Sequence, residues 1–451
     1  MNMRKLPLGN KAQYASAMLI RVGGAGLMFL MNIVLARTAG AENYGVMAIG
    51  LACGLVAMNL GSLGFSMSSI RFVAAYLQAE KYAQIKSFLG TAMAVTACGA
   101  ALAGLIALGI AIIGKHAGLL QENAARAFLL ALPLILIFPF VDLVGGIQRG
   151  YESIVRALAP YNLAFPVSVM AGAGLLWWFD PAAFDRGAAF WCLYIGAGVT
   201  IVLAGGLMLK RWPWEHETAK DAARGEWLRT SFAMIPSLAS GFAVRQIDAI
   251  VLSFFVSPSQ IALYWFAGRI TRLASFGLQA AHMVVSPQFA RLRAEVDHLG
   301  IAEVKADKAH VARMQAAASG AARATAVMAL PLVALLFVAG PLLLRMAGEE
   351  YAGALTVLYI ILLGEVVNVA CGLNGAFMNM TGLQNQLAKI SSSILVLYVV
   401  LVGFGSALYG ITGAAIAVSS ITIIQNLFMS RAVYRAFGVN TTMFSRHFWR
   451  R

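Results

Sequence analysis

Long apolar stretches alternate with short polar ones along the whole chain. Each stretch has about the length that a helix needs to cross the hydrocarbon core of a bilayer, on the order of 20 residues. Six stretches precede a charged break and six follow it, at 14–36, 44–66, 88–113, 125–147, 158–179, 188–209, 230–256, 260–286, 324–346, 354–379, 387–407 and 411–434. The pattern predicts an all-α, polytopic membrane protein with about 12 transmembrane helices.

The two sets of stretches share landmarks that indicate an internal repeat. Residues 33–35, Ile-Val-Leu, recur 217 positions later as residues 250–252. Residues 150–153, Gly-Tyr-Glu-Ser, align with residues 382–385, Gly-Leu-Gln-Asn, at an offset of 232. Internal repeats are the usual ground plan of secondary transporters, which place the substrate site between the halves. We therefore expect two repeated six-helix bundles.

The polar segment between the two groups of apolar stretches gives the expected domain boundaries. Residues 210–229 carry a dense mixture of charges and a single proline, Pro213, which is typical of a connector with an interfacial helix. The predicted organisation is an N-terminal six-helix bundle over 1–212, a cytoplasmic linker over 213–229, a C-terminal six-helix bundle over 230–440 and a cytoplasmic tail over 441–451.

Composition excludes several classes of protein. Apolar residues make up 60% of the chain, charged residues only 12%, and the mean hydropathy is +0.77, so soluble domains are excluded. The short basic start runs directly into a long apolar stretch, which argues against a cleavable signal peptide. The four cysteines all lie inside apolar runs without CxxC spacing, so neither disulfides nor a metal site is expected, at Cys53, Cys98, Cys192 and Cys371.

The net charge of +15 reflects topology, because the basic residues are spread between the apolar stretches. This spread argues against nucleic acid as a partner. Of the 34 Lys and Arg residues, four lie inside predicted spans, five lie in the odd-numbered loops, and the remaining 25 lie in the even-numbered loops and the two termini. By the positive-inside rule, both termini are cytoplasmic.

Arg269 and Arg272 lie one helical turn apart near the middle of the eighth span, so they share a helix face. An arginine at the centre of a membrane helix costs about 2.5 to 3.5 kcal/mol even on the lenient insertion scale. These two side chains therefore require a hydrated cavity or a buried acid, and we interpret them as substrate-binding residues. Arg21, about seven residues into the first span, is a third candidate, although its side chain is close enough to the membrane surface to snorkel.

Three acids within predicted spans are candidates for ion coupling: Asp142, Asp248 and Glu365. Each has two open roles, which are to neutralise an arginine or to take up and release a proton, because burial raises the pKa of a carboxyl group. Asp248 is three residues from Arg245, which allows a local pair.

Asn368 and Asn374 are candidate contacts to a hydroxyl-rich ligand, and their alternative role is hydrogen bonding between helices. No catalytic constellation emerges, because the six histidines are scattered, neither a Walker A nor a GxSxG pattern occurs, and no outside loop exceeds about a dozen residues. The chain is therefore expected not to be an enzyme and to need neither a cofactor nor a metal.

The first hairpin carries a family resemblance. VLARTAGAENYGVMAIGLA followed by NLGSLGFSMSSIRFVAAY resembles the opening of polysaccharide-biosynthesis flippases, the Wzx-type members of the multidrug/oligosaccharidyl-lipid/polysaccharide exporter (MOP) superfamily, and YWFAGRI with SPQFARL agrees with their seventh and eighth spans. The resemblance implies two bundles that form a V and exchange a lipid-linked oligosaccharide between leaflets by rocking. Related lipid II flippases line their cavity with arginines from spans one, two and eight. Arg21, Arg269 and Arg272 match two of these spans, whereas the second span lacks a charge until Arg71.

These features favour a flippase that moves an anionic undecaprenyl-pyrophosphate-linked oligosaccharide or polysaccharide precursor, as in O-antigen and lipopolysaccharide synthesis, across the bacterial inner membrane. Its expected partners are the lipid-linked glycan, the bilayer and a glycan polymerase or other assembly proteins. The alternative is a cation-coupled multidrug antiporter of the same superfamily, which requires acids to dominate the cavity, whereas four arginines here face three acids. A membrane glycan polymerase requires a large outside loop, which the sequence lacks.

Overall fold

The computed structural model describes residues 8–443 apart from 181, 183, 185–187, 220–222, 243–245 and 297. Within these residues every regular element is a helix, and no strand occurs. Eight helical stretches are long and apolar enough to cross a membrane. The predicted all-α, polytopic membrane fold is therefore confirmed, whereas the count of twelve spans stays a prediction.

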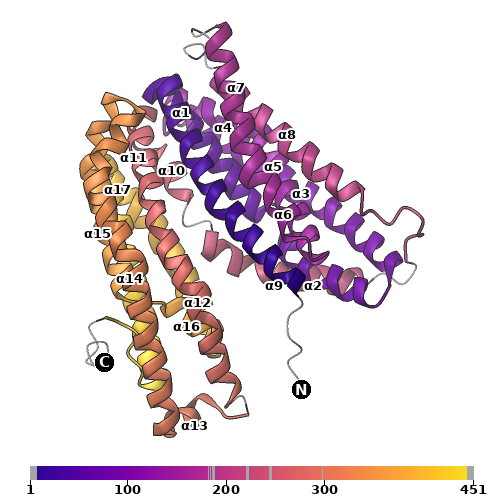
Figure 1. The fold of residues 1–451 in the computed structure, drawn as a ribbon. Coiled ribbons are helices and arrows are strands. Elements are labelled where there is room, and N and C mark those ends of the chain that lie inside the picture. The colour runs from indigo at the N-terminus through magenta and orange to yellow at the C-terminus, as the bar shows by residue number, and fades with distance from the viewer. Residues whose placement is uncertain are drawn as a thin grey trace. The chain divides into compact units, whose positions relative to one another are not determined.

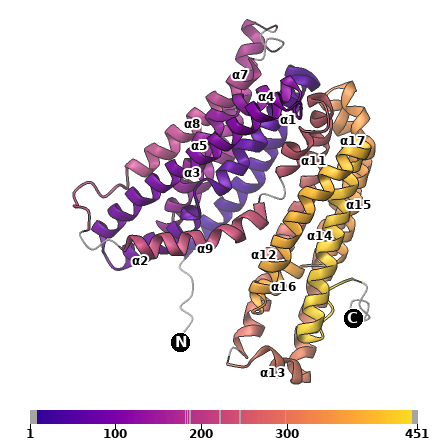
Figure 2. The same cartoon turned by 180° about the vertical axis from the view of Figure 1, so that it is seen from behind.

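Contacts divide the chain into two compact units, Met1–Ala262 and Leu263–Arg451. The four domain boundaries expected from the sequence stay a prediction. The helices of the first unit are drawn in indigo to pink in Figures 1 and 2: α1 (Leu8–Leu60), α2 (Phe65–Gln78), α3 (Tyr82–His116), α4 (Glu122–Leu130), α5 (Leu132–Gly150), α6 (Ile154–Ala159), a π-helical turn (Pro160–Ala164), α7 (Phe165–Phe179), α8 (Ala189–Leu209), α9 (Arg224–Phe242) and α10 (Ile247–Leu252).

Helix α11 (Pro258–Thr271) crosses the division between the units and leads into the second one. There the long helices α12, α14, α15 and α17 run side by side in both views (Figures 1 and 2). The elements that follow α11 are a 3₁₀ turn (Arg272–Ala274), α12 (Ser275–Ala294), α13 (Ile301–Ala306), α14 (Lys308–Ala347), a 3₁₀ helix (Glu349–Ala354), α15 (Leu355–Ala370), α16 (Asn374–Met380) and α17 (Gln384–Phe437).

The chain reverses inside α1, at Gly40. This glycine has φ 69° and ψ 167°, a conformation that costs glycine little because it lacks a Cβ. The Tyr44 hydroxyl donates a hydrogen bond of 2.7 Å to Oδ1 of Asn32, although 12 residues separate them. Along a straight helix that separation would be about 18 Å. The reversal lies between the first two predicted spans, as the polar stretch there predicts.

A second reversal divides α17, at Tyr409 and Gly410, where Gly410 has φ 57° and ψ −139°. The two arms of this hairpin approach closely because two glycines face each other across it. A Cβ on Gly405 would lie 2.6 Å from the carbonyl oxygen of Gly413, a distance that real Cβ atoms essentially never show. The arms correspond to the predicted spans 387–407 and 411–434.

Aromatic side chains mark the two ends of α8. Trp191 is exposed at its first turn, beside the exposed Trp178 and Phe179 at the end of α7. Trp214 is exposed just beyond the other end. The 21 residues of α8 span about 31 Å, which matches the thickness of a hydrocarbon core, about 30 Å. Tryptophans at both levels are typical of membrane–water interfaces.

The end of the predicted linker packs into the first unit. Trp227, in the first turn of α9, is fully buried. Its ring meets that of Phe88 edge-on at 5.3 Å between centroids, and its Nε1–H donates a hydrogen bond of 2.8 Å to the Tyr76 hydroxyl. The predicted linker 213–229 is charged overall, yet it contains a tryptophan, Trp227, that packs against α2 and α3.

The hairpin of α17 leads to a stability prediction. Gly413→Ala is expected to destabilise the protein by about 1 to 3 kcal/mol, because the new methyl group would lie 1.9 Å from the Gly405 carbonyl oxygen and force the arms apart. Thermal unfolding of the purified protein in detergent measures the effect. Gly198→Ala is the matched control, since nothing lies within 4 Å of a Cβ there. Equal melting temperatures for the two variants would contradict the close packing of the arms.

Candidate functional site

The two candidate arginines of the second unit lie where the helical geometry of the eighth span changes. Arg269 is in the last turn of α11, and Arg272 begins the 3₁₀ turn that connects α11 to α12. Both side chains are partly buried. A short 3₁₀ segment within a longer helical run often marks a hinge or a functional position.

Trp265 holds both guanidinium groups. The Cζ atom of Arg269 lies 4.0 Å from the centroid of its ring, and that of Arg272 lies 5.6 Å from it. Trp265 is itself buried, and within the described residues its indole Nε1–H has no hydrogen-bond partner. Cation–π attraction of this kind is worth about 0.5 to 2 kcal/mol, and more where water is excluded. The ring would thus offset part of the cost of two charges in the predicted eighth span.

When a guanidinium stacks on an aromatic ring, its in-plane N–H groups are the atoms through which it can bind an anion. A guanidinium stacked by its face directs its N–H groups outward in its own plane, in the fork that matches carboxylate or phosphate oxygens. Two such groups one turn apart form a cationic site for an oxyanion. Substrate binding by this pair stays a prediction.

A polar cluster in the first unit joins α1, α2 and α5. The guanidinium of Arg149 interacts electrostatically with the Asp142 carboxylate and with Arg21. It also donates hydrogen bonds to the Gly145 carbonyl at 3.2 Å and to the Ser66 hydroxyl at 3.4 Å. The Ser66 hydroxyl donates in turn to the backbone carbonyl of Asp142 at 3.0 Å. Both roles open to Asp142, neutralisation of an arginine and proton exchange, stay predictions.

Arg21 is exposed on α1. It joins the cluster from the neighbouring helix, so the cluster carries two cations for one acid and keeps a net positive charge. This position agrees with a charge near a membrane surface.

The second unit has a polar chain that links α15 to α17. The side-chain amide of Asn426 donates to Oδ1 of Asn368 at 2.9 Å, and the amide of Asn368 donates to the Glu365 carboxylate at 3.0 Å. Glu365 and Asn368 are partly buried, and Asn426 is buried. Among the described residues, Glu365 forms no ion pair. Its charge is therefore supported by an aligned amide dipole and not by a cation.

Asn374 has a different environment from Asn368. It is only 1% exposed, its amide donates to the Ser430 hydroxyl at 2.8 Å, and its Oδ1 accepts a short hydrogen bond from the Thr441 hydroxyl. Both polar atoms are thus used to bind α16 to α17 and to the segment that follows. The geometry favours the interhelical role that the sequence left open.

Two further sequence-predicted residues lie apart from these clusters. Asp248 is 8% exposed at the start of α10, where its Oδ1 accepts a hydrogen bond of 2.9 Å from the backbone N–H of Ala249. Arg245, its predicted partner, lies outside the described residues. Neither the Asp248 pair nor a role in coupling is tested by this geometry.

Charged contacts outside the spans are local. At the end of α3, the Lys115 ammonium donates to the Glu122 carboxylate at 2.9 Å, and this bond and charge lower the pKa of Glu122. Beyond α5, burial raises the pKa of the Tyr151 phenol, and Arg211 partly opposes the shift. The two residues exchange hydrogen bonds with each other's backbone carbonyls at 3.0 and 3.3 Å, so Tyr151 ties α8 to the turn after α5.

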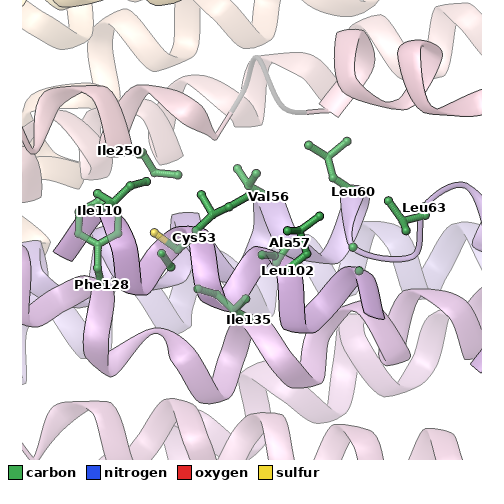
Figure 3. A pocket seen from close by; sticks show the side chains of 15 residues that line it. Cys53, Val56, Ala57, Leu60, Leu63, Leu102, Ile110, Phe128, Ile135 and Ile250 are labelled. Atoms are coloured by element: carbon green, nitrogen blue, oxygen red, sulfur yellow. The ribbon is translucent and has the colours of Figure 1, made fainter. Parts of the chain in front are cut away.

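An apolar cavity of about 240 Å³ lies between the second arm of α1 and α3 (Figure 3). Its walls include Val56, Leu102, Ile110, Phe128 and Ile135. The helices touch at its floor, because a Cβ on Gly99 would lie 2.2 Å from the Gly61 carbonyl oxygen. The cavity is suited to an aliphatic chain.

Sequence reasoning missed three residues of these sites. Trp265 precedes the arginines by four and seven positions, so the helical period alone puts all three on one face and was a usable signal. Arg149 was assigned to a polar loop, yet it reaches Ser66 and Asp142 from the end of α5. Asn426 carried no signal, because its partner Asn368 is 58 residues away.

Comparisons with known proteins found a family model and several solved structures that match the chain. The family model described as polysaccharide biosynthesis protein matches residues 12–293. No curated protein sequence matches the chain.

Solved structures of MOP superfamily proteins share the fold. An inward-facing multidrug resistance MATE family transporter is 13% identical with a TM-score of 0.68, and the match covers 92% of this chain and 94% of that one. The lipid II flippase MurJ in an inward closed conformation is 13% identical with a TM-score of 0.63, covering 92% and 87%. A MOP superfamily transporter from Pyrococcus furiosus is 14% identical with a TM-score of 0.57, covering 95% of each chain. At these identities the likeness establishes the fold alone.

The two asparagine environments can be separated by stability. Asn374→Ala is expected to destabilise the protein by about 1 to 3 kcal/mol, because it leaves the Ser430 and Thr441 hydroxyls buried without their amide partner. Asn59→Ala is the control, since its amide bonds only the Leu55 carbonyl of its own helix. Thermal unfolding in detergent compares the two. A melting temperature for Asn374→Ala as high as that of the control would show that the buried bonds contribute nothing.

Proposed function

Because this chain belongs to the polysaccharide biosynthesis protein family, we propose that it moves an anionic lipid-linked glycan from one leaflet to the other by alternating access. The substrate class proposed is an undecaprenyl-pyrophosphate-linked oligosaccharide or polysaccharide precursor, such as an O-antigen unit. The membrane proposed is the bacterial inner membrane, with both termini in the cytoplasm.

The observation that carries this proposal is the pair Arg269 and Arg272 stacked on Trp265. A pyrophosphate presents several anionic oxygens, and charge-assisted hydrogen bonds from arginine are about twice as strong as neutral ones. The pair lies in the predicted eighth span, where a charge is costly unless its site is hydrated or holds a counter-charge. A bound pyrophosphate would accept hydrogen bonds from the arginines, which would replace part of the water that the headgroup loses.

The lipid part of such a substrate needs apolar surface along its path. The cavity between α1 and α3 offers a lining of aliphatic and aromatic side chains (Figure 3). We propose that an isoprenoid segment lies there during part of the cycle. Burial of apolar surface there stabilises a complex by about 25 cal/mol per Å².

The carboxylates are proposed to set the charge balance during transport. Asp142 neutralises part of the cationic cluster of the first unit through Arg149. Glu365 is the better candidate for ion coupling, because its partner within hydrogen-bond reach is a neutral amide. Asp248 keeps the same proposed role at the start of α10.

One observation favours the second candidate function, a cation-coupled multidrug antiporter. A partly buried carboxylate in a membrane span, without an ion pair among the described residues, is the group that a proton or a cationic drug would bind, and Glu365 meets this description. The stacked arginines oppose this reading, because they repel a cationic cargo. Interaction with a glycan polymerase or other assembly proteins is part of the first proposal alone.

The arginine pair gives the functional prediction. Arg269→Ala and Arg272→Ala are each expected to reduce export of the glycan at least tenfold, since each removes a charge-assisted partner worth about 1.5 to 3 kcal/mol. Lysine at either position is expected to restore part of the export, because it keeps the charge and loses the fork. Surface glycan in a flippase-deficient strain that expresses each variant is the measurement.

Two further variants separate recognition from folding. Trp265→Phe keeps an aromatic face and is expected to retain most export, whereas Trp265→Leu is expected to behave like the alanine variants. Arg313→Ala is the matched control, because its guanidinium pairs with Glu295 at 2.7 Å outside the predicted spans. All variants are compared at equal membrane abundance. Normal export by both alanine variants would exclude the arginine pair from the substrate site.

A further inference from the structure

A cationic pocket lies at the open end of the α17 hairpin, and none of its lining residues belongs to the predicted eighth span. It has a volume of about 460 Å³ and lies among residues of both arms and the start of α13. Arg431 and Arg435 contribute the charge, Gln386 adds an amide, and Ile390 and Phe428 form an apolar wall. The pocket therefore has one polar side and one apolar side.

The two arginines are available to a ligand. They lie one turn apart on the second arm of α17, and both are exposed. Within the described part of the chain, neither guanidinium has an ion pair or a side-chain hydrogen bond. This contrasts with Arg313, which pairs with Glu295. Two like charges this close repel each other by a few tenths of a kcal/mol, so an anion placed between them removes a repulsion as well as adding an attraction.

Hydrogen bonds hold α13 against α17 and also engage the one acid of α13. The Lys305 ammonium donates to the Arg435 backbone carbonyl at 2.9 Å, which brings a third cation to the rim. Glu303 is the acid of α13, and its carboxylate accepts a hydrogen bond of 2.8 Å from the Gly300 backbone N–H. Three cations, Arg431, Arg435 and Lys305, thus outnumber the one acid of α13.

The position of the pocket identifies the kind of anion. Leu427 and Phe428, at the apolar end of the same helical segment, are more than half exposed, as expected for side chains that face lipid. Tyr434, between the two arginines, is also exposed, and tyrosine at this level is typical of the membrane interface. A free phosphate would use only the arginines, whereas a phospholipid uses the arginines and the apolar wall together.

We propose that this pocket binds the headgroup of an anionic phospholipid, with the phosphate between Arg431 and Arg435 and an acyl chain against Ile390 and Phe428. Basic pockets between transmembrane helices recognise anionic headgroups in this way. The lipid would hold the open end of the hairpin to α13 as a resident component of the second unit. This site is separate from the transport site proposed above.

Native mass spectrometry of the purified, delipidated full chain tests the proposal, with phosphatidylglycerol and phosphatidylcholine of identical acyl chains as probes. We expect phosphatidylglycerol to bind at least tenfold more tightly. Arg431→Ala and Arg435→Ala should each weaken its binding about fivefold, and the double variant about 25-fold, at the contribution typical of one basic residue near an anionic lipid surface. Phosphatidylcholine binding should not change.

Arg229→Ala is the control, because Arg229 is an exposed arginine of α9, in the other unit. It should bind phosphatidylglycerol like the wild type, and melting curves confirm that all variants are folded. Equal binding of the two lipids, full binding by the double variant, or an equal loss in the control would overturn the proposal. Displacement of phosphatidylglycerol by millimolar inorganic phosphate would overturn it as well, because the site would then recognise phosphate alone.

Discussion

Inside a membrane span, where water is scarce, a charged group must be stabilised by hydrogen bonds, aromatic faces or opposite charges of the protein. The cost of an unassisted arginine at this depth is about 2.5 to 3.5 kcal/mol, a large fraction of the net stability of a typical domain. Two arginines here are stacked on one buried tryptophan, and a third is placed beside an aspartate and a serine hydroxyl. The positions of the charges in each unit follow from these partners.

The same requirement governs the backbone and the smaller polar side chains. Both hairpins reverse at a glycine with positive φ, and the arms of α17 approach so closely that a methyl group would clash. Buried amides are paired across helices, as Asn374 is with Ser430 and Thr441. The close approach of the α17 arms and the paired amide of Asn374 therefore stabilise the second unit.

The sequence predicts the fold well, because a membrane imposes one strong rule on composition. The reversals at Gly40 and Gly410 lie in short gaps between predicted spans, and the all-α class follows from the need to satisfy the backbone in lipid. The helical period predicts that Arg269 and Arg272 share a face. It does not identify the packing partners of Asp142, Asn368 or Trp227, since these contacts join residues far apart in the chain. The buried role of Asn374 was not predictable for the same reason, as Thr441 lies 67 residues away.

The central claim is that the arginine pair carries an anionic headgroup across the membrane. A membrane potential of about 100 mV is worth roughly 2.3 kcal/mol per elementary charge moved, and it would act on an anionic cargo. The most direct measurement is flipping by the purified protein in proteoliposomes of two fluorescent isoprenoid lipids that differ only in the presence of a pyrophosphate. The account predicts that the pyrophosphate lipid is flipped selectively and faster when an inside-negative potential is imposed. Equal flipping of the neutral lipid would contradict it.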